Sequence, residues 1–174
     1  MNKKSMIFVT ILIILGVMIT AINISVKSND FEDILFSENE EKSGQGIQKL
    51  SRMELLLQDL LGEKYDEFYG GSWLDDNFMP FYAMTYIDED IKRIAGESDV
   101  TLINVKYSFS QLEEIMNHIP VSQENGIFQA SIIESLNAVE IGIEKKQYDT
   151  AIKLIESNGY LSEYYDAYYI ISAY

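Results

Sequence analysis

The sequence predicts an α+β domain, with helices packed on a mainly antiparallel sheet, preceded by one N-terminal transmembrane helix. The transmembrane helix is indicated by a run of nineteen residues without a charge, Met6 to Ile24. The α+β domain is indicated by the order of patterns after Ile47, which reads α, ββ, α, β, α, ββ, α. Hairpins mixed with helical crossovers in this way are typical of helices stacked on one face of a sheet.

The uncharged run is long enough to cross a membrane. At about 1.5 Å per helical residue it spans about 28 Å, close to the thickness of a bilayer's hydrocarbon core. Lys3 and Lys4 precede the run and Lys27 alone follows it, which favours a single-pass protein with its C-terminal domain outside. A cleaved signal peptide, and hence a secreted protein, is the alternative, with Ile19-Thr20-Ala21 as the best cleavage site.

Three segments follow from this interpretation. Residues 1–26 form the membrane anchor or signal peptide, residues 27–46 a polar linker, and residues 47–174 the extracytoplasmic α+β domain. The linker is predicted because Ser37 to Gly46 is charged and small throughout.

The balance of charge restricts the partners. All 28 acidic residues follow Asn29, whereas three of the 13 basic residues precede it, so the exported part carries 10 minus 28, or −18. This charge argues against nucleic acid and anionic lipid surfaces, which bind through clustered Lys and Arg. A solvated acidic surface and steering towards a basic partner are both compatible with it. The absence of cysteine excludes disulfides and thiolate zinc sites.

The first elements of the domain are read from periodicity and cap signals. A helix from Ile47 ends at Gly62, with an inward face predicted to consist of Ile47, Leu50, Met53, Leu57, Leu60 and Leu61. Two strands, residues 68–74 and 79–85, follow, and Pro80 is expected to limit the second to a sheet edge or a bulge. Asp88 caps a short helix that Gly96 closes, and residues 101–107 form a strand.

The second group of elements repeats the same kinds of signal. Ser108 with Gln111, and Ser110 with Glu113, form two overlapping capping boxes for a helix that Pro120 stops. Residues 127–133 and 139–143 form a hairpin, because Val139, Ile141 and Ile143 alternate with polar or small residues. The last helix runs from about Tyr148 to Asn158, with Gly159 as its C-terminal cap.

Part of the chain resembles a known family. The segments that carry the resemblance are Tyr69-Gly70-Gly71-Ser72-Trp73-Leu74-Asp75, then Thr85, Val105-Lys106-Tyr107-Ser108, Leu112, and Asn137-Ala138-Val139-Glu140-Ile141. In this order they are similar to the pro-region of the alpha-lytic protease group of secreted serine proteases. The resemblance covers roughly Leu61 to Glu144, includes no catalytic motif, and departs from the family at Pro80. It implies a partner protease and a folding or inhibitory role, although no protease follows in this chain.

The sequence offers little catalytic chemistry. A Ser-His-Asp arrangement would need His118, the only histidine, which lies on a helix beside a residue predicted to be buried. Adjacent carboxylates are expected by chance in a chain with 28 acidic residues. The turn Asp75-Asp76-Asn77 could hold calcium weakly but lacks the glycine and distal glutamate of a dedicated loop. Gly70-Gly71 is better explained by a bulge or a close approach than by a phosphate loop. We therefore predict no catalytic residues, no metal site and no cofactor.

The C-terminal tail is rich in tyrosine. Residues 160–174 contain six of the twelve tyrosines. They either close the core as a last strand or helix, or form an exposed recognition tail, because tyrosine is common at interfaces. We expect the partner-binding residues to be Tyr164, Tyr165, Tyr168, Tyr169 and Trp73. The function expected is a membrane-anchored, non-catalytic protein-binding module, and the alternative is an envelope sensor for a small ligand, peptide or cation.

Overall fold

The computed structural model describes residues 30–173. The chain divides into two units, residues 1–37 and 38–174, and every contact described below lies within the second. The predicted anchor lies outside the described residues. Among the helices of residues 30–173, none is both long and apolar enough to span a bilayer.

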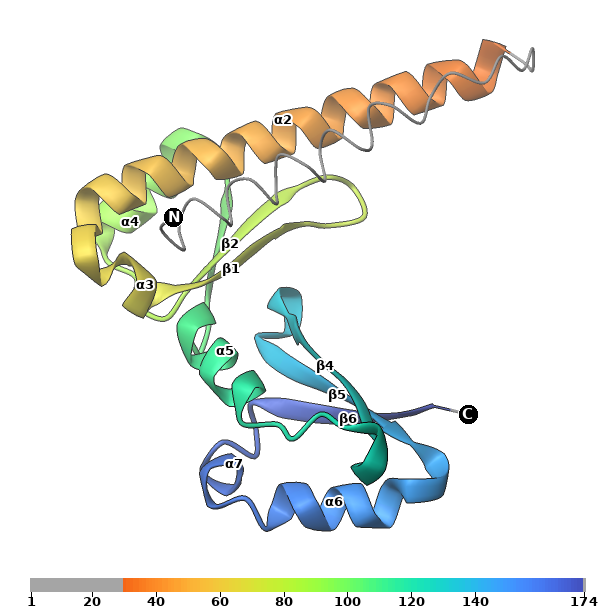
Figure 1. Cartoon of the computed structure of the whole chain (residues 1–174). Helices are drawn as coiled ribbons and strands as arrows, with labels where there is room; N and C mark the ends of the chain where they lie inside the picture. Colours follow the sequence, from red (N-terminus) through yellow and green to blue (C-terminus); the bar gives the residue numbers. More distant parts are fainter. Residues whose placement is uncertain (1–29, 174) are drawn as a thin grey trace, which may run out of the picture. The chain divides into compact units, whose positions relative to one another are not determined.

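The first half of the second unit, up to residue 104, is built on a three-stranded sheet (Figure 1). Its elements in order are α2 (Asp30–Leu61, which begins in the first unit), a 3-10 turn (Gly62–Lys64), α3 (Tyr65–Phe68), β1 (Tyr69–Leu74), β2 (Pro80–Met84), α4 (Glu89–Ser98) and β3 (Thr101–Asn104). The strand order is β1-β2-β3. β1 and β2 form an antiparallel hairpin, whereas β3 returns through α4 to pair with β2 in parallel.

The core of the first half is rich in aromatic and sulfur-containing side chains. Met53 and Leu57 of α2 pack with Tyr82 and Met84 of β2, and Ile91 of α4 closes the cluster. The hydroxyl of Tyr82 shares a hydrogen bond with that of Tyr65, so the buried phenols satisfy each other. Burial raises the pKa of Tyr65 and Tyr82 well above the ordinary range for tyrosine.

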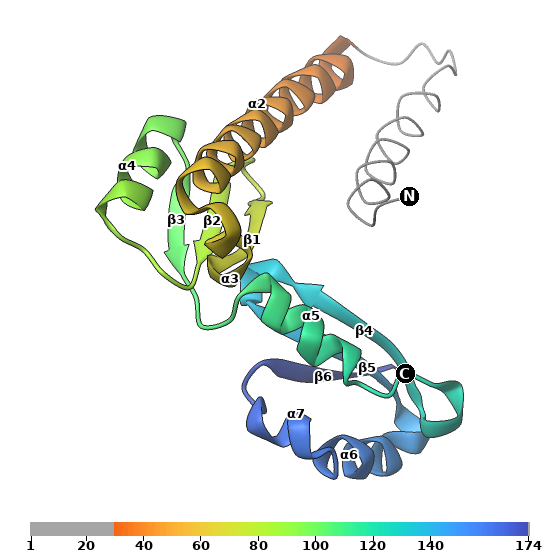
Figure 2. The ribbon, with the colours of Figure 1, turned by 60° about the vertical axis from the view of Figure 1, so that its left-hand side comes forward.

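The second half, residues 105–173, is built on a second three-stranded sheet (Figure 2). Its elements are α5 (Phe109–Asn117), a 3-10 turn (Gln123–Asn125), β4 (Ile127–Ile133), a 3-10 turn (Glu134–Leu136), β5 (Ala138–Glu144), a 3-10 turn (Lys145–Gln147), α6 (Tyr148–Glu156), α7 (Gly159–Glu163) and β6 (Tyr168–Ala173). The strand order is β4-β5-β6, with an antiparallel hairpin first and a parallel pairing second.

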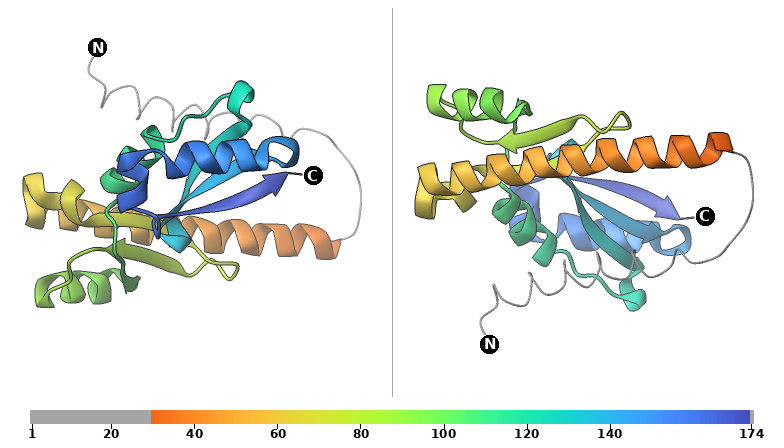
Figure 3. Two further views of the ribbon diagram at one scale, coloured as in Figure 1. Left: turned by 90° about the horizontal axis from the view of Figure 1, so that it is seen from below. Right: turned by 90° about the horizontal axis from the view of Figure 1, so that it is seen from above.

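The core of the second half is mainly aliphatic. Val139, Ile141 and Ile143 of β5 are fully buried and contribute to one cluster with side chains of all three helices of this half: Leu112 and Ile115 from α5, Ala151 and Ile155 from α6, and Leu161 from α7. The helices therefore pack against the inner face of the sheet, and Figure 3 shows α6 lying alongside it.

The two halves have the same topology and the same register. In each, a helix leads into an antiparallel hairpin, and a helical crossover leads into a third strand parallel to the second. Each first strand carries a bulge at its start, between Tyr69 and Gly71 in β1 and between Ile127 and Gln129 in β4. Tyr69 pairs with Met84 as Ile127 pairs with Ile143. The unit is thus an αββαβ arrangement that occurs twice.

The prediction of a single sheet was wrong. One mainly antiparallel sheet was expected, whereas each of the two sheets is mixed, with one antiparallel and one parallel pairing. The expectation for Pro80 was wrong as well, because β2 is the central strand of its sheet. Proline is tolerated there because it occupies the first position of the strand, where it need not donate to the ladder.

Several predicted helix boundaries also differ. The stretch 30–46, predicted as a linker, is helical and continues directly into the predicted helix, so that α2 begins at Asp30. α4 continues past Gly96 to Ser98, because Asp99 takes up the left-handed conformation that ends it. Asn158 accepts from the backbone N–H groups of Tyr160 and Leu161 and so begins a new helix, where Gly159 was expected to end the previous one.

Other local predictions are confirmed or corrected by single contacts. Asp88 caps α4 through the N–H of Ile91, and Ser108 forms the predicted capping box with Gln111. The second box does not form, because the Ser110 hydroxyl donates to the carbonyl of Asp66. On α2, Ile47 and Leu60 are exposed although they were expected to face inward.

Candidate functional site

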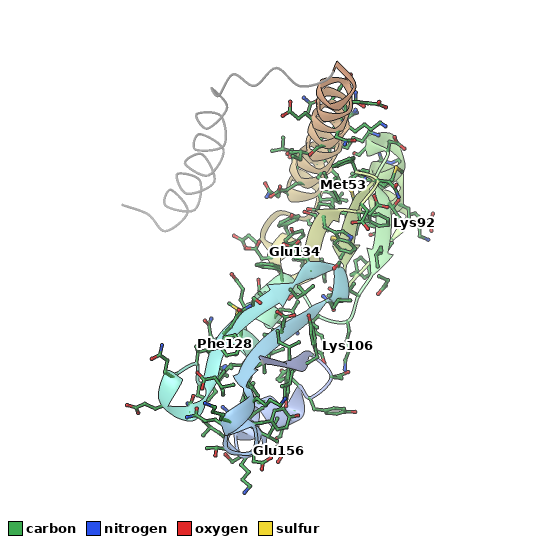
Figure 4. All side chains as sticks on the ribbon, turned by 90° about the vertical axis from the view of Figure 1, so that its right-hand side faces the viewer. Met53, Lys92, Lys106, Phe128, Glu134 and Glu156 are labelled. Carbon is green, nitrogen blue, oxygen red and sulfur yellow. The ribbon has the colours of Figure 1, made fainter. Side chains whose placement is uncertain are left out.

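The outer face of the second sheet, opposite the helices, carries exposed apolar side chains. Phe128 of β4 is 40% exposed and Ile171 of β6 is 39% exposed. Between them Gly142 of β5 pairs with Ile171, and a Cβ at Gly142 would come within 2.6 Å of the Phe128 ring, so this ring lies over the glycine. Gln129 is the register partner of Gly142 on β4, and Phe128 is the extra residue of the bulge beside it. The Phe128 ring, Gly142 and Ile171 are here called the apolar row; Phe128 is labelled in Figure 4.

β6 is an edge strand without the usual protection against strand pairing. Its six residues include no charge and no proline, and its pairing with β5 runs without a bulge from Val139 and Tyr168 to Glu144 and Ala173. Edge strands of soluble proteins are normally interrupted by one of these features, because a free row of N–H and C=O groups is a template for another strand.

The free hydrogen-bonding groups of β6 can be assigned from its register. The N–H of Val139 donates to the carbonyl of Ala167 (2.8 Å). Because bonding direction alternates along a strand, Tyr169 and Ile171 bond to β5, while the N–H groups of Ile170 and Ser172 point to the free edge.

The other three sheet edges are shortened or occupied. On β1 the edge N–H of Ser72 donates to the Glu134 carboxylate (2.5 Å), and a bulge interrupts the strand. β3 has only four residues. On β4 a bulge follows Ile127, and the N–H of Ser122 donates to the carbonyl of Ile127 (2.8 Å). β4 has seven uncharged residues, but this bulge and the Ser122 bond interrupt its edge at the start, so among the edges of the described sheets β6 alone is longer than four residues, uncharged and free of a bulge.

The segment that joins the two halves holds the start of β6. Lys106 forms an ion pair with one oxygen of Asp166 (2.5 Å), and the Tyr107 hydroxyl donates to the other (2.5 Å). These donors hold the pKa of the Asp166 carboxyl below its usual range. The backbone of Asn137 is in the left-handed conformation. Its side-chain oxygen accepts a hydrogen bond from the N–H of Tyr107 (2.9 Å), and its side-chain NH₂ donates to the carbonyl of Tyr107 (2.8 Å). The β4–β5 turn and the turn before β6 are therefore both tied to Tyr107, and Lys106 adds a second contact to the turn before β6.

The predicted partner-binding residues do not form one surface. Tyr164 and Tyr168 are half-buried and pack against the core of the second half. Tyr165 is 74% exposed, and Tyr169 lies on the outer face, where its hydroxyl donates to Glu140 (2.8 Å) and this contact raises its pKa. Trp73 belongs to the first sheet and stacks on Phe81 with ring centroids 5.6 Å apart.

Phe128, Ile171 and Glu134 were not predicted from the sequence. Ile171 could have been found by assigning the tail as a strand in register with β5, whereas Phe128 lies over Gly142 only because of the bulge in β4, where Gln129 is the register partner of Gly142. Glu134 had no local signal, since its partner Ser72 lies 62 residues away in the chain. It also explains Gly71, where the backbone has a φ of +133° and a Cβ would come within 2.9 Å of the Glu134 side chain. Gly70 leaves room for Val105.

The residues considered for catalysis and metal binding have local structural roles. His118 ends α5, its Nδ1 lies 2.8 Å from the carbonyl oxygen of Glu114, and its ring stacks on Tyr160. One oxygen of Asp75 accepts from the N–H groups of Asn77 and Met79 and so shapes the hairpin turn. Within residues 30–173 no group of three or more Asp, Glu or His side chains is arranged to hold a metal ion.

One open hollow of about 280 Å³ lies beside the start of α5. It is lined by Asp66, Glu67, Ser108, Ser110, Gln111 and Glu114. The polar groups of Ser108 and Gln111 are engaged in the helix cap, and the Ser110 hydroxyl is bonded to the backbone. These hydrogen bonds stabilise the start of α5 and its contact with α3, so the polar groups of Ser108, Ser110 and Gln111 are already engaged.

Comparison of the chain with protein-family models gives no match, and comparison with curated proteins gives none either.

Proposed function

We propose that the protein is a non-catalytic protein-binding module that binds an extended segment of another protein at the free edge of β6. The observation that carries this proposal is the contrast among the four sheet edges, of which only β6 is long, uncharged and uninterrupted. Strand addition supplies affinity through main-chain hydrogen bonds, and the apolar row beside the edge supplies side-chain contacts.

The partner is proposed from the sequence. The resemblance of residues 61–144 to the pro-regions of the alpha-lytic protease group makes a secreted serine protease the first partner to test. A module of this kind would act as a stand-alone inhibitor or folding helper. The uncharged N-terminal run, with more lysines before it than after it, supports a location on the outer side of the cell membrane, where secreted proteases are found.

A matched pair of proline substitutions tests strand addition. Ser172→Pro removes an edge N–H of β6 without removing a bond to β5. Asn104→Pro makes the same change at the equivalent position of β3, since the N–H of the following residue, Val105, donates to Met84 of β2. The full chain, solubilised in a mild detergent, is titrated with secreted serine proteases of the same cell.

We expect Ser172→Pro to weaken protease binding at least tenfold, about 1.4 kcal/mol, and Asn104→Pro to leave it unchanged. Circular dichroism of both variants controls for folding. Binding that survives Ser172→Pro in a folded protein would contradict strand addition at β6. The absence of binding to any secreted protease would instead favour the alternative, a sensor of a small ligand or cation.

A further inference from the structure

We propose that the segment which pairs with β6 carries a lysine or arginine and an apolar residue two positions apart. This inference rests on the proposed function and specifies its partner. Side chains two positions apart in a strand lie on the same face, so both would lie over the outer face of the second sheet.

The apolar residue is required by the apolar row. Ile171 reaches the edge of the sheet, and Phe128 lies behind it over Gly142. An added strand places one side chain beside Ile171 on the outer face, about 4.8 Å beyond β6. An apolar side chain there would cover Ile171 and remove exposed apolar surface from water.

The basic residue is required by the adjacent row. Two positions before Ile171 along β6, Tyr169 pairs with Glu140, and its hydroxyl donates to the Glu140 carboxylate. The neighbouring position on an added strand lies about 10 Å from the β5 backbone, within the combined reach of an extended lysine or arginine and a glutamate. The cation can thus lie over the Tyr169 ring and approach Glu140.

Charge also distinguishes this partner from a second copy of the chain. The exported part carries −18, so two copies repel each other. Glu163 and Asp166 precede β6 at the Tyr169 end, and the charge of Lys106 is already paired with Asp166. The opposite end is different, because Glu144 is followed by Lys145 and Lys146. Because Asp166 and Lys106 neutralise each other, Glu140 and Glu163 are the carboxylates that favour a cation beside Tyr169.

Synthetic peptides of eight residues test the spacing directly. The probes are threonine- and valine-rich peptides with one lysine and one isoleucine two positions apart, in both orders, because the added strand can run in either direction. One control has the same composition with the two residues three positions apart, so that they lie on opposite faces. A second control replaces the lysine by glutamate. Binding to the full chain in mild detergent is measured by fluorescence anisotropy at low and physiological salt.

We expect one of the peptides with lysine and isoleucine two positions apart, here called two-apart peptides, to bind about tenfold more tightly than either control. The preference for lysine over glutamate should shrink with salt and disappear in Glu140→Gln, whereas Glu124→Gln, on an exposed turn, should retain it. Equal binding of the lysine and glutamate peptides, together with its loss in Ser172→Pro, would overturn this inference and leave strand addition intact. If none of the peptides binds, the inference also fails, and the protease titration of Ser172→Pro then decides the proposed function separately.

Discussion

The two halves of the chain share a topology and a register but differ in core and edge. The core of the first half includes two tyrosines and two methionines among aliphatic side chains, and its third strand has four residues with Thr101 and Asn104 exposed at its ends. The second half has an aliphatic core, and its third strand has six residues without a charge. The two third strands, β3 and β6, thus occupy equivalent positions in the fold but differ in length and in composition. A long unprotected edge is a liability for a free protein, and this is why the proposed function assigns the edge of β6 to partner binding.

The largest effect is expected from a charge in the aliphatic core. Ile141 is fully buried on β5, so Ile141→Asp leaves an unpaired carboxylate among apolar side chains. The substitution should cost about 4 kcal/mol or more and unfold the second half. Glu140→Gln, one position along on the outer face, keeps an acceptor for Tyr169 and should cost under about 0.5 kcal/mol. Equal thermal stability of the two variants would show that the β5 register is wrong.

A smaller effect is expected in the aromatic core of the first half. Tyr82→Phe removes one partner of the buried hydroxyl pair and leaves the Tyr65 hydroxyl without it. We expect a loss of about 1 to 3 kcal/mol in urea denaturation. The double variant Tyr65→Phe/Tyr82→Phe should lose less than the sum of the two single variants, because no unpaired hydroxyl remains. Additive losses would mean that the two hydroxyls do not depend on each other.

The turn between β4 and β5 gives the next smaller effect. Asn137→Gly keeps the left-handed backbone but removes the two hydrogen bonds to the Tyr107 backbone. A loss of about 1 to 2 kcal/mol is expected in urea denaturation. A change below about 0.3 kcal/mol would show that these two bonds contribute nothing net to stability.

The contact of Glu134 with β1 predicts a dependence on pH. Burial raises the pKa of Glu134 above its ordinary value of 4.5, so the folded protein binds this proton more tightly than the unfolded chain. The stabilisation from this group is therefore full below pH 4.5 and is lost as the pH rises through the raised folded pKa. In Glu134→Gln the unfolding free energy at pH 7, relative to that at pH 4.5, should therefore be higher than in the unsubstituted protein. An unchanged difference would contradict burial of the carboxyl.

The element types were predictable from the sequence because each depends on neighbouring residues. Asp88, Ser108 and Gly62 mark helix ends through contacts within a few positions, and the alternation around Ile141 identifies β5. The pairing of strands was not predictable in this way. Whether β3 joins β2, or β6 joins β5, depends on crossovers that return a strand over many residues.

The candidate site was predicted only in part, for the same reason. The tyrosine-rich composition predicted that the tail contains partner-binding residues. Which of its tyrosines face the core, however, depends on the register of β6 with β5. Tyr164 and Tyr168 pack inward and Tyr169 outward. Ile171 and Phe128 become neighbours of Gly142 only once the three strands are aligned.

Residue-resolved amide hydrogen exchange, with and without a bound partner strand, tests the central claim most directly. In the free protein the amides of Ile170 and Ser172, which point to the free edge, should exchange much faster than those of Tyr169 and Ile171. On binding of a protease or of a two-apart peptide, Ile170 and Ser172 should become protected, while Leu102 and Asn104 at the equivalent edge of β3 stay unchanged. Protection that appears on β3, or binding that leaves Ile170 and Ser172 unprotected, would contradict strand addition at β6.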